Sequence, residues 1–178
     1  YRSYCFDYEN SGKTVVLLKP SGIDTLVNTL GIKSEIDLRN ESTKTSSILG
    51  SGVNYYRFGM NYDNDLMSNN KTAIKNVFDT LADSSNYPVI WHCQAGADRT
   101  GVITYLLNGL LGVSKDDLLR DYLLTNFAVN DSASRELSNI QSKYVKTLDE
   151  MRTAFSWMDD TLFNKCIDVI ENYLIIFF

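Results

Sequence analysis

The chain is predicted to have an α/β fold, with a mainly parallel central sheet flanked by helices and a helical C-terminal half. Two patterns lead to this prediction. Short apolar runs alternate with segments of helical period over the first half of the sequence, which is typical of parallel strands joined by crossover helices, and a run of helical patterns follows over the second half. Because ligands bind at the carboxyl ends of the strands in such sheets, a functional site is expected in the loops that follow the strands.

The predicted strands are residues 15–18, 34–38, 53–58 and 89–91. The last of these runs lacks polar alternation, which favours a buried central strand. A short helix is expected over residues 24–30, after a turn at residues 20–22 that contains proline and glycine. A longer helix is expected over residues 71–84, where apolar residues recur at helical spacing.

The second half of the chain carries the remaining helical patterns. Residues 100–111 are apolar on nearly every face, as in a helix that is buried on all sides. Ser114, with two aspartates after it, is predicted to be the N-cap and acidic first turn of the next helix. A long amphipathic helix is expected with apolar positions from 137 to 155, and a last helix from about Thr161.

The composition argues against several classes of function. Lys and Arg number 17 against 22 for Asp and Glu, and this acidic balance argues against nucleic acid as a partner. Cys5, Cys93 and Cys166 lie far apart, which supports neither a disulfide framework nor a zinc site. No long uncharged apolar run is present, so no membrane span is expected. One domain over residues 1–178 is expected, with an apolar end that suggests a longer natural chain, while the compartment and the oligomeric state stay open.

The sequence HCQAGADRTG at residues 92–101 follows the last predicted strand and opens the apolar helix. A strand, a loop that contains Gly96 and a helix N-terminus would direct backbone N–H groups toward one point, which makes an anion-binding site. The loop lacks the Gly-Lys-Ser/Thr of nucleotide-binding phosphate loops. The same N–H groups would stabilise a Cys93 thiolate as a nucleophile, and the planar guanidinium of Arg99 can bind two phosphate oxygens at once.

A cysteine, five residues, then Arg-Thr-Gly, with a histidine before the cysteine, resembles the signature of the cysteine-dependent protein tyrosine phosphatases. The matching positions are His92, Cys93, Gly96, Arg99, Thr100 and Gly101. The loop is similar to that of the bacterial branch, which includes tyrosine and lipid phosphatases, and so are GIKSEIDLRNE at residues 31–41 and DYLLTN at residues 121–126. The resemblance covers about residues 22–174 and implies a phosphatase-like α/β fold.

The resemblance also implies a role for each loop residue. Cys93 would attack phosphorus to form a cysteinyl-phosphate intermediate, and water would then hydrolyse it, with neither metal nor cofactor. The implied phosphate-binding residues are Gln94, Ala95, Gly96, Ala97, Asp98 and Arg99. Thr100 would hydrogen-bond the thiolate and assist its departure, and His92 would help hold the loop and tune the thiolate. Gly101 belongs to the same supporting group.

The general acid that protonates the leaving oxygen has two candidates. In the branch that the chain resembles, this acid is the aspartate within the loop, here Asp98. In dual-specificity phosphatases it lies on a separate loop about thirty residues before the cysteine, where Asp63 and Asp65 stand in this chain. Asp98 is favoured and Asp63 is the rival. Whichever of the two is the acid must come within hydrogen-bond reach of the leaving oxygen.

The substrate expected from the resemblance is phosphotyrosine on a protein or peptide, or a small phosphomonoester. Ala97 stands where many members of the branch carry lysine, and the loop therefore lacks a cation that a multiply phosphorylated substrate would need. A phosphoinositide or inositol phosphate phosphatase, a dual-specificity phosphatase and a phosphate-binding pseudophosphatase are the alternatives. Asp37 and Arg39 either organise the pocket or are plain strand-end charges, while Cys5 and Cys166 are expected to be inert.

Overall fold

The central sheet of this computed structural model, which describes residues 1–62, 66, 68–124 and 160–175, has four parallel strands. In spatial order they are β1 (Arg2–Ser3), β6 (Val89–His92), β4 (Ser34–Arg39) and β5 (Asn54–Met60). Because all pairings are parallel, the carboxyl ends of these strands lie at one edge of the sheet. The predicted α/β fold with a parallel sheet is confirmed, and β6 is central and buried as expected.

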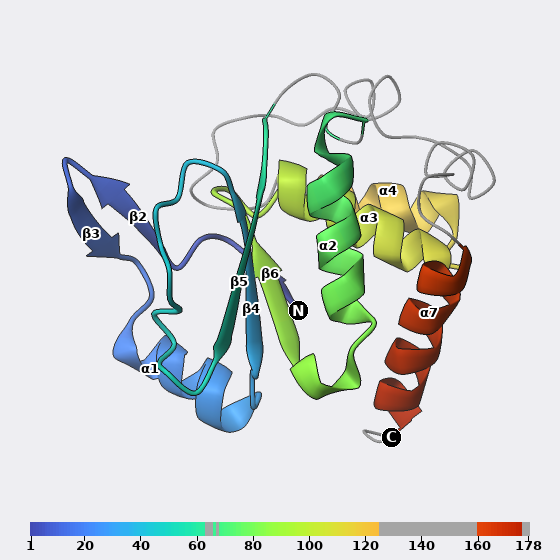
Figure 1. The fold of residues 1–178 in the computed structure, drawn as a ribbon, viewed down its shortest axis with the longest axis horizontal. Coiled ribbons are helices and arrows are strands. Elements are labelled where there is room, and N and C mark those ends of the chain that lie inside the picture. The colour runs from blue at the N-terminus through green and yellow to red at the C-terminus, as the bar shows by residue number, and fades with distance from the viewer. Residues whose placement is uncertain (63–65, 67, 125–159, 176–178) are drawn as a thin grey trace.

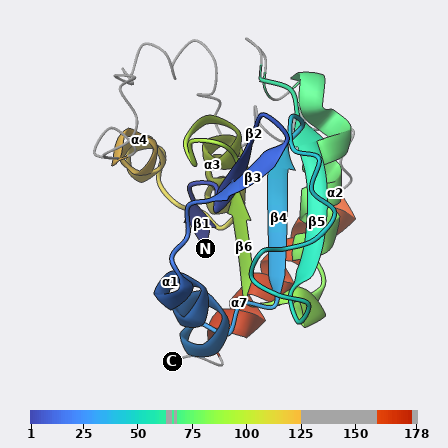
Figure 2. The same ribbon diagram turned by 90° about the vertical axis from the view of Figure 1, so that its left-hand side faces the viewer.

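A separate antiparallel hairpin, formed by β2 (Asp7–Asn10) and β3 (Lys13–Val16), lies beside the carboxyl-end half of the central sheet (Figures 1 and 2). The strand predicted at residues 15–18 therefore begins earlier and does not join the central sheet. Neither β1 nor β2 was predicted from the sequence. The first has two residues and the second reads DYEN, so neither offers an apolar run that could reveal it.

The helices cover both faces of the central sheet. Figure 1 shows α1 and the hairpin on one side of the sheet, and the remaining helices on the other. These are α2 (Lys71–Leu81), α3 (Asp98–Leu110), α4 (Lys115–Leu123) and α7 (Asp160–Ile175). The main core lies between the sheet and these helices, and its fully buried members include Ile36, Leu38, Met60, Ile74, Phe78 and Ile103.

The first helix begins earlier than predicted. α1 (Pro20–Asp24) continues directly into a π-helical turn, η1 (Thr25–Thr29). The prediction of a turn at residues 20–22 is therefore wrong. Proline is tolerated at the first helical position because its missing N–H would have no intrahelical partner there, and Pro20 occupies that position. A proline followed by glycine was therefore the start of a helix.

Three helical predictions are confirmed in their details. The Ser114 hydroxyl accepts a hydrogen bond from the Asp117 N–H at 3.2 Å, which makes Ser114 the N-cap of α4. Nearly every side chain of α3 is buried. Cys166 of α7 is fully buried, its sulfur donates to the Phe78 carbonyl, and burial raises the pKa of its thiol to about 12, as suits an inert core cysteine.

Two further expectations fall outside the described residues, namely the helix over 137–155 and the surroundings of Asp63 and Asp65. Within the described part of the chain, no helix is both long and apolar enough to cross a membrane.

Candidate active site

The loop between β6 and α3 lies at the carboxyl edge of the sheet and carries Cys93. The strand ends at His92, Cys93 follows with 2% of its surface exposed, and the helix begins at Asp98. Ala97 is the N-cap of α3 and provides no side-chain cap, so the helix relies on other partners for its first N–H groups. Cys93 therefore lies in the loop that leads into the positive N-terminal end of a buried helix.

Gly96 is required by the shape of this loop. Its φ angle is +67°, in the left-handed region that favours glycine. A Cβ atom at this position would lie 2.5 Å from the carbonyl oxygen of Ser3 and 2.9 Å from the Tyr4 nitrogen. The loop thus packs directly on the backbone at the end of β1. The short edge strand that the sequence did not reveal thus supports the loop that carries Cys93.

Gly101 serves a different purpose, at the contact between α3 and α4. A Cβ atom there would lie 3.2 Å from the ring of Tyr122. The hydroxyl of Tyr122 in turn donates to Oδ1 of Asp98 at 3.5 Å. Because Asp98 is the first residue of α3 and is only partly buried, its carboxyl group stays accessible beside the loop.

The guanidinium of Arg99 is held by Glu41. Arg99 Nη1 donates to Glu41 Oε2 at 2.7 Å and Nη2 donates to Oε1 at 2.8 Å, while 5% of Arg99 is exposed. Burial acts to lower the pKa of Arg99, but its bonds with Glu41 and its interaction with the Cys93 sulfur prevail and raise it. The same contact lowers the pKa of Glu41. Arg99 is thus a fixed cation close to Cys93.

Among the described residues, two buried polar atoms at this site have no hydrogen-bond partner: Arg99 Nε and Thr100 Oγ1. The bond from Thr100 to the Cys93 sulfur that the resemblance implies is not formed, so the role of Thr100 stays a prediction. Buried polar groups are normally satisfied, because an unpaired one costs about 1–3 kcal/mol. Both of these unpaired atoms belong to residues of the Cys-Xaa5-Arg-Thr-Gly signature.

His92 lies under the loop and is fully buried. Its Nε2 lies 2.9 Å from Glu35 Oε1, and its Nδ1 lies 3.3 Å from the carbonyl oxygen of Cys93. Its ring also packs against Phe6, with the centroids 4.9 Å apart. The histidine therefore connects the central strand β4 to the backbone of Cys93.

Asp37 and Arg39 form a buried charge network beside this histidine. Arg39 Nη2 lies 2.6 Å from Asp37 Oδ2 and 3.1 Å from Asp7 Oδ1, and the Tyr55 hydroxyl donates to Asp37. Burial acts to raise the pKa of Asp37, but its bonds with Arg39 and the neighbouring His92 hold it below the usual value. The network links the hairpin to the central sheet beneath the loop.

Sequence reasoning missed the two glutamates that hold the signature residues, Glu35 and Glu41. Both lie within the 31–41 stretch that supported the resemblance, but neither was given a role. For Glu35, a signal in the sequence was available. In β4, Glu35, Asp37 and Arg39 alternate with apolar residues in a strand whose two sides are covered, and charges at such positions indicate a buried polar network.

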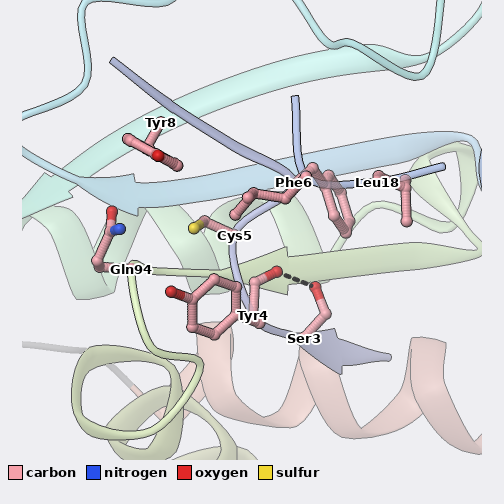
Figure 3. Close-up of a pocket in the computed structure, with 8 residues that line it drawn as sticks. Ser3, Tyr4, Cys5, Phe6, Tyr8, Leu18 and Gln94 are labelled. Atoms are coloured by element: carbon pink, nitrogen blue, oxygen red, sulfur yellow. Dashed lines mark hydrogen bonds between the residues drawn. The ribbon is translucent and has the colours of Figure 1, made fainter. Parts of the chain in front are cut away.

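Two cavities adjoin the loop and share Gln94 and Tyr8. The larger, about 730 Å³, is mainly apolar and is lined by Cys5, Phe6 and Leu18 among others (Figure 3). The smaller, about 220 Å³, is lined mostly by polar and charged residues and is called the polar cavity below. Its lining residues are Asp7, Tyr8, Glu9, Arg39, Glu41, Ser42, Lys44 and Gln94. No cluster of three or more potential metal ligands occurs among the described residues.

The parallel sheet with a Cys-Xaa5-Arg loop at its carboxyl edge defines the class of cysteine-dependent tyrosine phosphatases. A sequence model described as the tyrosine phosphatase family matches residues 12–178, so the chain belongs to that family. Among curated relatives, it is 36% identical over 59 residues to the tyrosine-protein phosphatase of Nostoc commune, a match covering 33% of this chain and 20% of the relative. It is 37% identical over 57 residues to the triple specificity protein phosphatase PtpB of Mycobacterium tuberculosis, covering 32% and 21%.

Solved structures with a similar fold are more distant in sequence. The core catalytic domain of the PP-IP phosphatase SIW14 from S. cerevisiae is 19% identical, with a TM-score of 0.57 over 89% of this chain and 88% of that one. P. aeruginosa TpbA is 17% identical, with a TM-score of 0.53 over 80% and 85%. At these identities the likeness concerns the fold alone.

Proposed function

We propose that this chain hydrolyses phosphate monoesters through a cysteinyl-phosphate intermediate, and that phosphotyrosine in a protein or peptide is its preferred substrate. The observation that carries the proposal is a pair of buried atoms, Arg99 Nε and Thr100 Oγ1, in the first turn of α3 after the Cys93 loop, for which the described residues supply no hydrogen-bond partner. A phosphoryl group can accept from the Arg99 donor, and the Thr100 hydroxyl can donate to the sulfur as it leaves. Family membership supports the same chemistry.

In the proposed first step the Cys93 thiolate attacks phosphorus, the bond to the ester oxygen breaks, and Asp98 gives that oxygen a proton. Arg99 and the loop N–H groups stabilise the charge on the three equatorial oxygens. In the second step a water molecule gives a proton back to Asp98 and attacks phosphorus. Inorganic phosphate and the Cys93 thiolate are then released.

The charges around the loop favour a substrate with a single phosphoryl group. Both cations that line the polar cavity are already committed, since Arg39 is paired with Asp37 and Asp7, and Lys44 Nζ lies 2.7 Å from Asp7 Oδ2. Ala97 adds no cation to the loop. A multiply phosphorylated inositol would therefore bring charges that these described residues leave without partners.

The test compares turnover of a phosphotyrosine peptide with that of phosphoinositides and inositol polyphosphates. We expect the peptide to give the highest kcat/KM, Cys93→Ser to abolish turnover, and Cys5→Ser to retain it as the matched cysteine control. Mass spectrometry of quenched reactions should detect phosphate on Cys93. A strong preference for inositol phosphates would overturn the substrate assignment, and tight peptide binding without turnover would overturn the activity.

A further inference from the structure

The last turn of α4 lies beside the first turn of α3. α3 ends at Leu110 and α4 begins at Lys115, and this short connection makes the two helices antiparallel neighbours (Figures 1 and 2). Tyr122, in the last turn of α4, therefore lies beside Asp98 and Gly101. Tyr122 is 7% exposed, and a Cβ atom on Gly101 would lie 3.2 Å from its ring. The ring can approach α3 this closely because Gly101 has no side chain.

This contact places the Tyr122 hydroxyl against the carboxyl group of Asp98. The hydroxyl donates to Oδ1 of Asp98 at 3.5 Å, which is long for a bond between two oxygen atoms. Catalytic hydrogen bonds are often long in a free enzyme and shorten when the substrate binds. The bond also becomes stronger when Asp98 loses its proton, because a hydrogen bond to an ionised acceptor is roughly twice as strong as one to a neutral acceptor.

Arg2 fastens the same turn of α4 to the central sheet. Its Nη1 donates to Asp121 Oδ2 at 2.8 Å, and its Nη2 donates to the Asp121 carbonyl oxygen at 3.0 Å. That carbonyl belongs to the last turn of a helix, where oxygens lack intrahelical partners and cations are favourable. Arg2 precedes Ser3 in β1, and the Ser3 carbonyl packs against Gly96 of the loop. β1 therefore contacts the loop directly and also holds the helix whose tyrosine faces Asp98.

We propose that Tyr122 is a positioning residue for Asp98, and that the Arg2–Asp121 pair keeps Tyr122 in place. With Oδ1 accepting from Tyr122, the proton that Asp98 donates to the leaving oxygen is carried by Oδ2. The tyrosine thus orients the acid before the reaction and stabilises its carboxylate as the proton leaves. The inference rests on the proposed function, in which Asp98 is the general acid.

The test measures kcat/KM, which covers the steps up to departure of the leaving group, for p-nitrophenyl phosphate and for an alkyl phosphate. p-Nitrophenolate leaves without a proton, whereas an alkoxide requires one. Tyr122→Phe keeps the ring against Gly101 and removes only the hydroxyl. We expect it to lower kcat/KM for the alkyl phosphate by about three- to tenfold, as loss of one hydrogen bond implies, and to leave the value for p-nitrophenyl phosphate nearly unchanged. Equal decreases for the two substrates would overturn the proposal.

Tyr56→Phe is the matched control. The Tyr56 hydroxyl donates to Asn86 Oδ1 at 2.9 Å, and Asn86 precedes β6, at the opposite edge of the sheet from the loop. This variant loses a hydrogen bond of the same kind, but the ratio of its two kcat/KM values should equal that of the wild type. A change in the ratio as large as that in Tyr122→Phe would indicate a general effect of lost stability and would count against the positioning role.

The coupling between the two residues is measured in Asp98→Asn. There Tyr122→Phe should not alter the ratio further, because no acid remains to be oriented. An effect of Tyr122→Phe that persists in Asp98→Asn would overturn the positioning role and leave Asp98 as the acid. If Asp98→Asn by itself does not alter the ratio, Asp98 is not the general acid, and the proposed step and the role of Tyr122 both fail.

Arg2→Met tests the second part of the proposal and stays decisive if Tyr122→Phe fails to fold. It removes both bonds to Asp121 and leaves Tyr122 itself unchanged. The ratio should therefore shift in the same direction as in Tyr122→Phe, by a smaller factor. Lys75→Met is its control, since it breaks an exposed pair on α2, in which Lys75 Nζ lies 2.7 Å from Asp79 Oδ2. A ratio in Arg2→Met no different from that in Lys75→Met would refute the role of the Arg2–Asp121 pair.

Discussion

Arg99 donates two hydrogen bonds to Glu41, one to each carboxylate oxygen, and its buried Nε atom has no partner within the described part of the chain. The two residues are 58 positions apart in the chain. A guanidinium held in this way is already oriented, so little side-chain entropy is lost when it meets a phosphoryl group. The glutamate also offsets the cost of burying the cation.

Replacing Glu41 tests this orientation. We expect Glu41→Gln to lower kcat/KM for a phosphotyrosine peptide by about tenfold, because a charge-assisted pair contributes roughly 1.5–3 kcal/mol. The inhibition constant of inorganic phosphate should rise in parallel. Glu9→Gln, on the rim of the same polar cavity, should change kcat/KM by less than about twofold, as is usual for an exposed charge. Equal losses in the two variants would contradict the role of Glu41.

The general acid can be identified by varying the leaving group. Asp98→Asn should reduce kcat by about 10²–10⁴-fold for an alkyl phosphate and much less for p-nitrophenyl phosphate, whose leaving group needs no proton. Asp63→Asn should change kcat by the same factor for both substrates, and Asp65→Asn is its neighbouring control. The reverse pattern, with Asp63→Asn sensitive to the leaving group, would transfer the role to Asp63.

The buried pair of Asp37 and Arg39 makes stability depend on pH. Since the pKa of Asp37 is lowered by folding, its contribution is complete above the unfolded value of about 3.9 and is lost as the pH falls through the lower folded value. Asp37→Asn should therefore lower the free energy of unfolding by about 3–5 kcal/mol at pH 7. Urea unfolding should show this difference shrinking below about pH 4. A difference that stays constant down to pH 2 would rule out this linkage.

The left-handed glycine of the loop can be tested with two matched glycines. Gly112→Ala, at φ +80° with no atom near its Cβ, should cost about 1–2 kcal/mol from backbone strain alone. Gly52→Ala has neither strain nor contact and should be close to neutral. Gly96→Ala adds a 2.5 Å contact with the Ser3 carbonyl. It should therefore destabilise the protein more than Gly112→Ala does, as measured by thermal unfolding, and should also reduce activity. Stability and activity losses no greater than those of Gly112→Ala would show that the contact with β1 is unimportant.

Local patterns in the sequence were sufficient for several features. The period of the apolar residues predicted α2, and the cap residue Ser114 predicted the start of α4, because both signals depend on neighbours within a few positions. Turn chemistry was less reliable. Pro20 and Gly22 suit a turn and the first turn of a helix equally well, and the structure has a helix here, with Ile23 partly buried against a second core cluster.

The sequence by itself determined the chemistry of the loop, since a histidine, a cysteine, a glycine and an arginine at fixed spacing are all contributed by ten consecutive residues. Only the tertiary structure decided which groups hold them. Glu35 and Glu41 reach His92 and Arg99 through the parallel alignment of β4 with β6, and Gly96 meets β1 across the sheet edge. These contacts join residues more than fifty positions apart in the chain, and the register of the strands, to which no local pattern is sensitive, sets their geometry.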